Sequence, residues 1–161
     1  LKIPTDEISA KLYAFKGVEH RIEYVANLNN VKYYNDSKAT NIDSVIAAIN
    51  SFESPITLIL GGLDKGADFK ALRKIVKKKK ISIVAYGSAA ERISKTLRDA
   101  ANLYLTDKLK EAIEISKKVT HPGEIVLLSP GCASYDQFLN FEERGMFFKQ
   151  TVKAFAVAWP T

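Results

Sequence analysis

Residues 33–41 of the chain read Tyr33-Tyr34-Asn35-Asp36-Ser37-Lys38-Ala39-Thr40-Asn41. The stretch begins as the end of an apolar β-type run and leads into Ile42, Val45, Ile46 and Ile49, an apolar stripe at helical spacing. A strand-to-helix turn at the carboxyl end of a strand is where open α/β sheets place ligands. Because Asn, Asp, Ser and Thr also form ordinary turns and caps, a purely structural turn is the alternative. The mixture of carboxylate, amine, hydroxyls and carboxamides favours a binding site.

Strands and helices alternate on both sides of this turn. Two β-rich runs, Arg21–Leu28 and Val31–Asn35, are joined by Asn29-Asn30, a hairpin signal. Four further strands are predicted, at 56–60, 81–86, 103–105 and 124–128. Helices are predicted after Pro4–Glu7, from Thr40 to about Ser51, at 68–78, 88–99 and 107–119, and along a final face marked by Phe141, Phe148, Val152 and Phe155. The pattern predicts one α/β domain over residues 1–161, a Rossmann-like three-layer fold with a mostly parallel sheet and helices on both faces.

Two helix starts carry a capping-box pattern. Ser88 is followed three residues later by Glu91, and Ser134 is followed three residues later by Gln137. In such a box the two side chains satisfy backbone N–H groups of the first helical turn. We therefore expect one helix to begin at Ser88 and another to begin at Ser134.

Composition excludes several classes of function. The 161 residues contain one cysteine and two histidines, so a disulfide within the chain or a thiolate metal cluster is excluded, and no metal site is expected. Cys132, with no histidine near it in sequence, is interpreted as a buried small hydrophobe rather than a nucleophile. The chain has no apolar run of membrane-spanning length and no signal peptide, so a cytoplasmic protein without membrane contact is expected. We also expect it to be a monomer.

The net charge is +6, and the densest basic patch is formed by Lys70, Arg73, Lys74 and the run Lys77–Lys80. Lysines at the carboxyl end of a helix are favoured by the helix dipole, and no aromatic side chains accompany this run. We interpret it as a solvated helix end. A nucleic-acid-binding face at these lysines is the alternative, and it would make binding salt-sensitive.

Three predicted loops at strand ends contain polar or charged side chains together with glycines or small residues that suit ligand binding: 35–41, 61–66 and 129–134. The second contains three glycines, which let backbone approach a ligand closely, and Lys65, which supplies a positive charge. The third leads exposed backbone amides into a helix, which suits an anion. The carboxyl ends of parallel strands share one edge, so these loops are expected to converge on an anion-binding site. Neither G-x-G-x-x-G nor a P-loop is present.

Several of these segments together resemble the Mur ligases. They are His20-Arg21, the 35–41 turn, Leu60-Gly61-Gly62 with Lys65, the stretch from Leu128 to Phe138, and Asn140-Phe141-Glu142-Glu143-Arg144-Gly145. The resemblance covers residues 17–155 and is closest to the C-terminal domain of the family members that add D-glutamate. The string Asn35 to Asn41 is the most specific part, because the ligases for other amino acids carry other sequences at this turn.

The resemblance implies a reaction and a division of roles. Such enzymes use ATP and Mg²⁺ to phosphorylate the carboxylate of UDP-MurNAc-L-alanine, and the amine of D-glutamate then attacks the acyl phosphate. By the same resemblance, the nucleotide is bound by Arg21, Asp36 and Lys38 with His20 beside it, and the catalytic residues are Lys38, Asp36 and His20. D-Glutamate is held by Thr40, Lys65, Ser134 and Phe141. From the residues alone, the alternative for Phe141 is that it fills the core or makes its contact through the backbone, and His20 could equally be a partly buried structural residue.

The resemblance also implies missing parts. In the family, the P-loop and most Mg²⁺ ligands lie in a central domain and the UDP-sugar binds an N-terminal domain, and neither pattern is found in this sequence. The chain alone is expected to be inactive and, in the whole enzyme, to close over the other domains as a lid, with Leu1–Lys16 near the hinge. A stand-alone Rossmann-like nucleotide-binding or regulatory module is the alternative to this interpretation.

Overall fold

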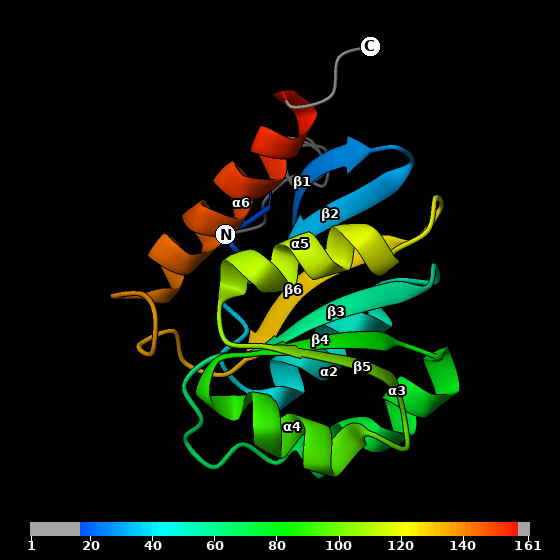
Figure 1. The fold of residues 1–161 in the computed structure, drawn as a ribbon, viewed down its shortest axis with the longest axis vertical. Coiled ribbons are helices and arrows are strands. Elements are labelled where there is room, and N and C mark those ends of the chain that lie inside the picture. Colours follow the sequence, from blue (N-terminus) through cyan, green and yellow to red (C-terminus); the bar gives the residue numbers. More distant parts are fainter. Residues whose placement is uncertain (1–16, 158–161) are drawn as a thin grey trace, which may run out of the picture.

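A computed structural model of the protein describes residues 17–157 and contains one six-stranded sheet in the order β1-β2-β6-β3-β4-β5 (Figure 1). The strands are β1 (Glu23–Leu28), β2 (Val31–Asn35), β3 (Ile56–Gly61), β4 (Ser82–Tyr86), β5 (Asn102–Thr106) and β6 (Ile125–Gly131). Only the β1–β2 pair is antiparallel, and the other four pairs are parallel. The prediction of a mostly parallel α/β sheet is therefore confirmed.

Helices cover both faces of this sheet (Figure 1). They are α2 (Ile42–Asn50), α3 (Arg73–Lys79), α4 (Ala90–Leu97), α5 (Leu109–Val119) and α6 (Phe141–Val157), with 3-10 turns at Phe69–Leu72 and Gly87–Ala89. One buried cluster lies under α2, α3 and α4 and includes Ile49, Val76 and Ile93, whereas a second lies under α5 and α6 and includes Ile113 and Phe148. β3 and β6 are buried at every residue because they lie between the two clusters.

The strand order places three loops side by side. The chain runs from β2 through α2 to β3, continues outward to β4 and β5, and returns with β6 between β2 and β3. The carboxyl ends of β2, β6 and β3 are therefore neighbours, and the loops 35–41, 129–134 and 61–66 leave from the same edge. This is the switch point at which open α/β sheets bind ligands.

The hairpin signal at Asn29-Asn30 is confirmed. Both residues have a positive φ, 52° and 62°, as a two-residue type I′ turn requires. Asparagine tolerates this left-handed conformation better than most residues do, which explains its use at both positions.

Both predicted capping boxes are wrong. The first turn of α4 has no side-chain cap, and Ser88 instead donates its hydroxyl to the Gly62 carbonyl, 3.1 Å away. α6 begins at Phe141 rather than at Ser134, and Gln137 bonds Leu109 N and the Asp107 carbonyl through its side chain. In both cases, a contact with a distant segment replaces the local cap.

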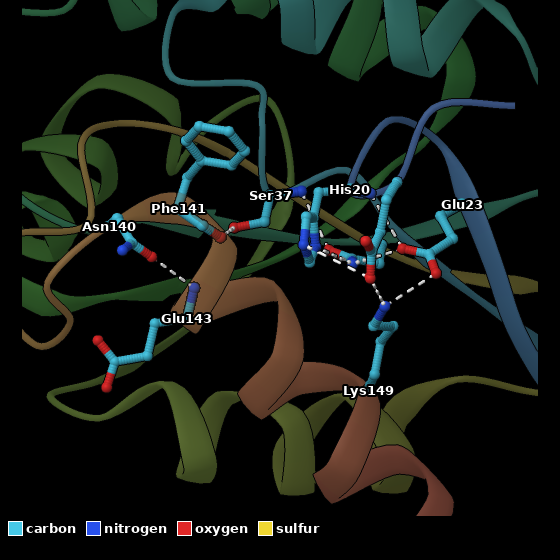
Figure 2. A network of polar contacts seen from close by, with 9 residues as sticks. His20, Glu23, Ser37, Asn140, Phe141, Glu143 and Lys149 are labelled. Carbon is cyan, nitrogen blue, oxygen red and sulfur yellow. Dashed lines mark hydrogen bonds and ion pairs between the residues drawn. The ribbon is translucent and has the colours of Figure 1, made fainter.

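The cap of α6 is formed by Asn140 and Glu143 (Figure 2). The Asn140 side chain accepts a hydrogen bond from Glu143 N at 2.7 Å, and the Glu143 carboxylate accepts one from Leu139 N at 2.7 Å. In a capping box, the Glu side chain accepts a hydrogen bond from the backbone N–H of the N-cap residue itself. Here it accepts from Leu139 N, one residue before the N-cap residue Asn140. The helix predicted after Pro4–Glu7 lies outside the described residues.

Candidate functional site

The turn that follows β2 is held in shape by Asn35. Its side-chain oxygen accepts from Ser37 N at 3.1 Å, and its amide nitrogen donates to Glu23 at 3.0 Å and lies 2.9 Å from His20 Nδ1. Because an amide nitrogen only donates, His20 Nδ1 is the acceptor. Asn35 is fully buried, so these bonds satisfy polar groups that water does not reach.

Asp36 is fully buried and both of its carboxylate oxygens have protein donors. Ile22 N donates to Oδ1 at 3.2 Å, and the Ser129 hydroxyl donates to Oδ2 at 2.8 Å. Burial raises the pKa of Asp36, against the opposing effects of Ser129, Ile22 N and the nearby Arg21 charge. This carboxylate joins the turn after β2 to the segment before β1 and to β6.

Arg144 links α6 to this turn. Its side chain is fully buried and donates to the hydroxyl and the carbonyl of Ser37, both at 2.9 Å, and to the Cys132 carbonyl at 3.0 Å. The Ser37 hydroxyl in turn donates to the Phe141 carbonyl at 2.8 Å (Figure 2). Sequence reasoning missed Arg144 as a site residue. The sequence did contain a signal that Arg144 is buried, because its spacing of four residues from Phe148 places it on the same apolar face of the helix.

A cavity of about 680 Å³ lies among the three loops. Its walls include Thr40 and Asn41 from the first loop, Lys65 from the second, Tyr135 from the segment after β6, and Phe141 at the start of α6. Three predicted D-glutamate residues, Thr40, Lys65 and Phe141, are therefore brought together. Ser134 is buried and does not line the cavity, although residues on both sides of it do.

Each loop lysine lies over an aromatic ring. Lys38 Nζ is 5.1 Å from the centre of the Phe141 ring, and Lys65 Nζ is 5.1 Å from the centre of the Tyr135 ring. Both lysines are exposed. Lys65 lines the same cavity as Thr40 and Asn41, whose hydroxyl and carboxamide also suit carboxylates and phosphates.

His20 and Arg21 precede β1 and do not line the cavity. His20 is buried, has a φ of 62°, and places its ring edge-on to Phe141 with 6.1 Å between ring centres. Arg21 is exposed. The structure thus buries His20 next to a residue of the cavity wall, and its role beside the nucleotide stays a prediction.

An ion-pair cluster surrounds His20 (Figure 2). Side-chain atoms of Glu19, His20 and Glu23 lie within 4.8 Å of one another, as metal ligands would. The Lys149 ammonium, however, lies 2.6 Å from Glu19 and 3.0 Å from Glu23. The cluster therefore already contains its cation, supplied by α6.

The two glycines at the carboxyl end of β3, Gly61 and Gly62, allow close backbone packing. A Cβ on Gly61 would lie 2.0 Å from the Tyr86 carbonyl oxygen, and one on Gly62 would lie 2.5 Å from the Ala133 carbonyl oxygen. Their φ values are 138° and 122°, which side chains rarely adopt. We expected these glycines to let backbone approach a ligand, whereas in the structure they let it approach Tyr86 of β4 and Ala133 of the loop after β6.

Cys132 is buried, and burial raises the pKa of its thiol to about 12. A thiol held in this protonated form is a poor nucleophile, so the interpretation of Cys132 as a buried hydrophobe is confirmed. Among the described helices, none is long and apolar enough to cross a membrane.

The sequence is similar to one protein family and to several of its named members. Residues 20–132 match the family described as Mur ligase, glutamate ligase domain. The UDP-N-acetylmuramoylalanine–D-glutamate ligase of Caldanaerobacter subterraneus is 46% identical over 154 residues, with 93% of this chain and 34% of the relative covered. The ligase of the same name from Desulfatibacillum aliphaticivorans is 43% identical, with 91% and 33% covered. The chain therefore spans about a third of the length of these relatives.

Solved structures show the same fold at low sequence identity. The UDP-N-acetylmuramate-alanine ligase of Thermotoga maritima superposes with a TM-score of 0.60 at 15% identity, covering 96% of this chain and 35% of that protein. The MurF ligase of Thermotoga maritima, solved in complex with ADP, gives 0.60 at 14% identity, with 90% and 34% covered. The solved structures show the fold, and the match over residues 20–132 establishes that the chain belongs to the Mur ligase family, as its glutamate ligase domain.

Proposed function

We propose that this chain is the amino-acid-binding third of an ATP-dependent ligase that joins D-glutamate to UDP-MurNAc-L-alanine in peptidoglycan precursor synthesis. ATP phosphorylates the terminal carboxylate of the UDP-linked substrate. The amine of D-glutamate then attacks the acyl carbon, the amide bond forms, the amine loses a proton and phosphate leaves. Mg²⁺ and most of the nucleotide site belong to the part of the enzyme that corresponds to the other two thirds of the relatives.

The observation that carries the proposal is the cavity between the three loops. Thr40 and Lys65, from loops far apart in sequence, line it together, which suits the carboxylates of an acidic amino acid. Lys38 contacts the ring of Phe141, which lines this cavity, and its charge can offset that of a phosphoryl group. The ligase names of the relatives, at more than 40% identity, support the same substrates.

Roles for the remaining predicted residues follow from where they lie. We assign Arg21 and Lys38, which are exposed, to the nucleotide phosphates. Asp36 and His20 are buried, so we assign them to orienting the turn that carries Lys38. Ser134 is buried and does not line the cavity, so we assign it to D-glutamate binding through the loop that it shares with the lining residues Ala133 and Tyr135.

The proposal predicts distinct behaviour for the 161-residue chain and for a complete enzyme. Alone, the chain lacks two thirds of the relatives' length, so we expect no ATP turnover and only weak D-glutamate binding. NMR titration with D-glutamate should shift the backbone amides of Thr40, Lys65 and Phe141, and L-glutamate should shift them less. Substantial ligase activity of the isolated chain would contradict this account.

A chimera tests the reaction itself. The C-terminal third of the Caldanaerobacter ligase is replaced by this chain, and phosphate release is measured with UDP-MurNAc-L-alanine, ATP and D-glutamate. The relative's own C-terminal third, rejoined at the same position, controls for the junction. We expect D-glutamate-dependent turnover, and we expect Lys65→Ala to raise the KM for D-glutamate at least tenfold because it removes a charge-assisted contact, about 1.5–3 kcal/mol. A folded chimera without D-glutamate-dependent turnover would contradict the proposal.

A further inference from the structure

The position of the Lys65 ammonium needs an explanation. The backbone of its loop is anchored, because Leu63 N donates to the Ala133 carbonyl at 2.9 Å and Asp64 is paired with Arg92. The Lys65 side chain itself is exposed and has four rotatable bonds. Within residues 17–157, the interaction found for its ammonium is the one with the Tyr135 ring, 5.1 Å away.

Core packing does not explain the presence of Tyr135. The side chain is 63% exposed, whereas Ser134 beside it is 3% exposed. Tyr135 belongs to the loop after β6 and Lys65 to the loop after β3, so their contact bridges two walls of the same cavity. An exposed ring in a binding cavity is a candidate for contact with a ligand or with a residue that binds one.

An aromatic ring holds a cation without neutralising it. The face of a tyrosine ring attracts an ammonium electrostatically but carries no net charge. A carboxylate partner, such as Asp64 for Arg92, would occupy the donors and cancel the charge. Lys38 makes a similar contact, with its Nζ 5.1 Å from the ring centre of Phe141, another residue that lines the cavity. Both ammonium groups therefore keep their positive charge for an anionic ligand.

We propose that Tyr135 is a positioning residue that holds the Lys65 ammonium over the cavity, where it meets a carboxylate of the incoming acidic amino acid. The inference rests on the proposed function and deepens it, because it names the residue that sets the strength of this recognition. Tyr135 acts through Lys65, so its loss weakens amino-acid binding and leaves the nucleotide and the chemical step unaffected.

The contact can be tested on the 161-residue chain without any activity. A proton above a ring face is shielded, so the ε-methylene protons of Lys65 should resonate upfield of their usual position. Tyr135→Leu should remove this shift and Tyr135→Phe should preserve it. Identical Lys65 shifts in the original chain and in Tyr135→Leu would overturn the proposal.

The consequence for recognition is measured in the chimera described above. Tyr135→Leu should raise the KM for D-glutamate about two- to fivefold, the strength expected of an exposed cation–π contact, with the kcat and the KM for ATP unchanged. Tyr135→Phe should restore the original KM. Tyr104→Leu, at an exposed tyrosine of β5 outside the cavity, is the matched control and should change nothing.

The possible failures can be told apart. A chimera that does not use D-glutamate at all contradicts the proposed function, and the Lys65 proton shifts then still report on the contact. A chimera that uses D-glutamate with the same KM in Tyr135→Leu contradicts the role of Tyr135 alone. An equal rise in KM for Tyr135→Leu and Tyr135→Phe would assign the effect to the hydroxyl rather than to the ring face, and would also overturn the proposal.

Discussion

At the scale of single residues, polar side chains in the turn after β2 divide into two groups. Asn35 and Asp36 are buried and make all of their contacts with the protein, whereas Lys38 and Thr40 are exposed. The sequence shows that the turn contains many polar and charged side chains, but it does not show which of them are buried and which are exposed. Burial depends on the neighbouring strands, which lie far away in sequence. Direct contact of Asp36 with a nucleotide stays a prediction.

The burial of Asp36 predicts an unusual dependence of stability on pH. Burial raises its pKa above the ordinary value of 3.8, so the native chain binds this proton at a higher pH than the unfolded chain does. The contribution of Asp36 to the free energy of unfolding should therefore decrease as the pH rises from 3.8 through the raised pKa. Denaturant unfolding of the original chain and of Asp36→Asn at several pH values measures this difference.

Asp64 provides a control of opposite sign. The hydrogen bond from Arg92 lowers the pKa of Asp64 below 3.8, so its contribution to stability is present above that pH and is lost as the pH falls through the lowered value. The difference in free energy of unfolding between the original chain and Asp64→Asn should therefore become smaller as the pH falls below 3.8. The effect of Asp36→Asn on the free energy of unfolding should have the opposite pH dependence to that of Asp64→Asn. If both effects changed with pH in the same direction, the burial argument for Asp36 would be wrong.

At the scale of elements, sequence patterns located the strands and helices better than their ends. Strand and helix periodicity depends on local spacing, and the hairpin turn depends on two adjacent asparagines. The start of a helix depends on which partner a side chain finds. Ser88 bonds Gly62 and Gln137 bonds Leu109 and Asp107, so neither caps the helix that its spacing predicts.

Gly145 in α6 allows a prediction in which local and tertiary effects have opposite signs. Gly→Ala inside a helix stabilises by about 1 kcal/mol from propensity alone. A Cβ at this position would lie 2.2 Å from His20 Nδ1 and 3.1 Å from the Asn35 amide nitrogen, both in buried side chains. Overpacking of this kind costs about 1–3 kcal/mol. We therefore expect Gly145→Ala to lower the free energy of unfolding, measured by denaturant titration.

Gln150→Ala is the matched control for the helix propensity. Gln150 is exposed on the same helix, so its replacement by alanine should change the stability by less than about 0.5 kcal/mol. Stabilisation by Gly145→Ala would show that His20 and its neighbours can move away from α6, and would remove the argument that α6 holds the segment before β1.

At the scale of the whole molecule, the topology explains why part of the site could be predicted. A mostly parallel sheet brings the carboxyl ends of its strands to one edge, so three chemically rich loops at strand ends had to meet. Arg144 and Tyr135 could not be predicted in this way. The bonds of Arg144 to Ser37 and Cys132, and the contact of Tyr135 with Lys65, depend on how α6 and the loops pack.

The same topology separates the lysine run from the site. Lys77–Lys80 ends α3 and leads into the amino end of β4, whereas the cavity lies at the carboxyl ends of the strands. A strand of six residues such as β3 is about 20 Å long, and charges are screened within about 8 Å at physiological salt. The charges of the run should therefore have little effect on ligands in the cavity.

A triple variant tests this separation and the nucleic-acid alternative together. Lys77, Lys78 and Lys80 are exposed and are replaced in Lys77→Gln, Lys78→Gln and Lys80→Asn, with asparagine chosen because position 80 has a φ of 51°. Lys79 is kept because its ammonium donates to the Ile49 and Phe52 carbonyls. In the chimera, the KM values for D-glutamate and ATP should change less than twofold, whereas Lys65→Ala should raise the first of them. A large rise in either KM for the triple variant would show that the basic run acts on the site. Salt-sensitive binding of DNA or RNA by the original chain, lost in the triple variant, would favour a nucleic-acid-binding face.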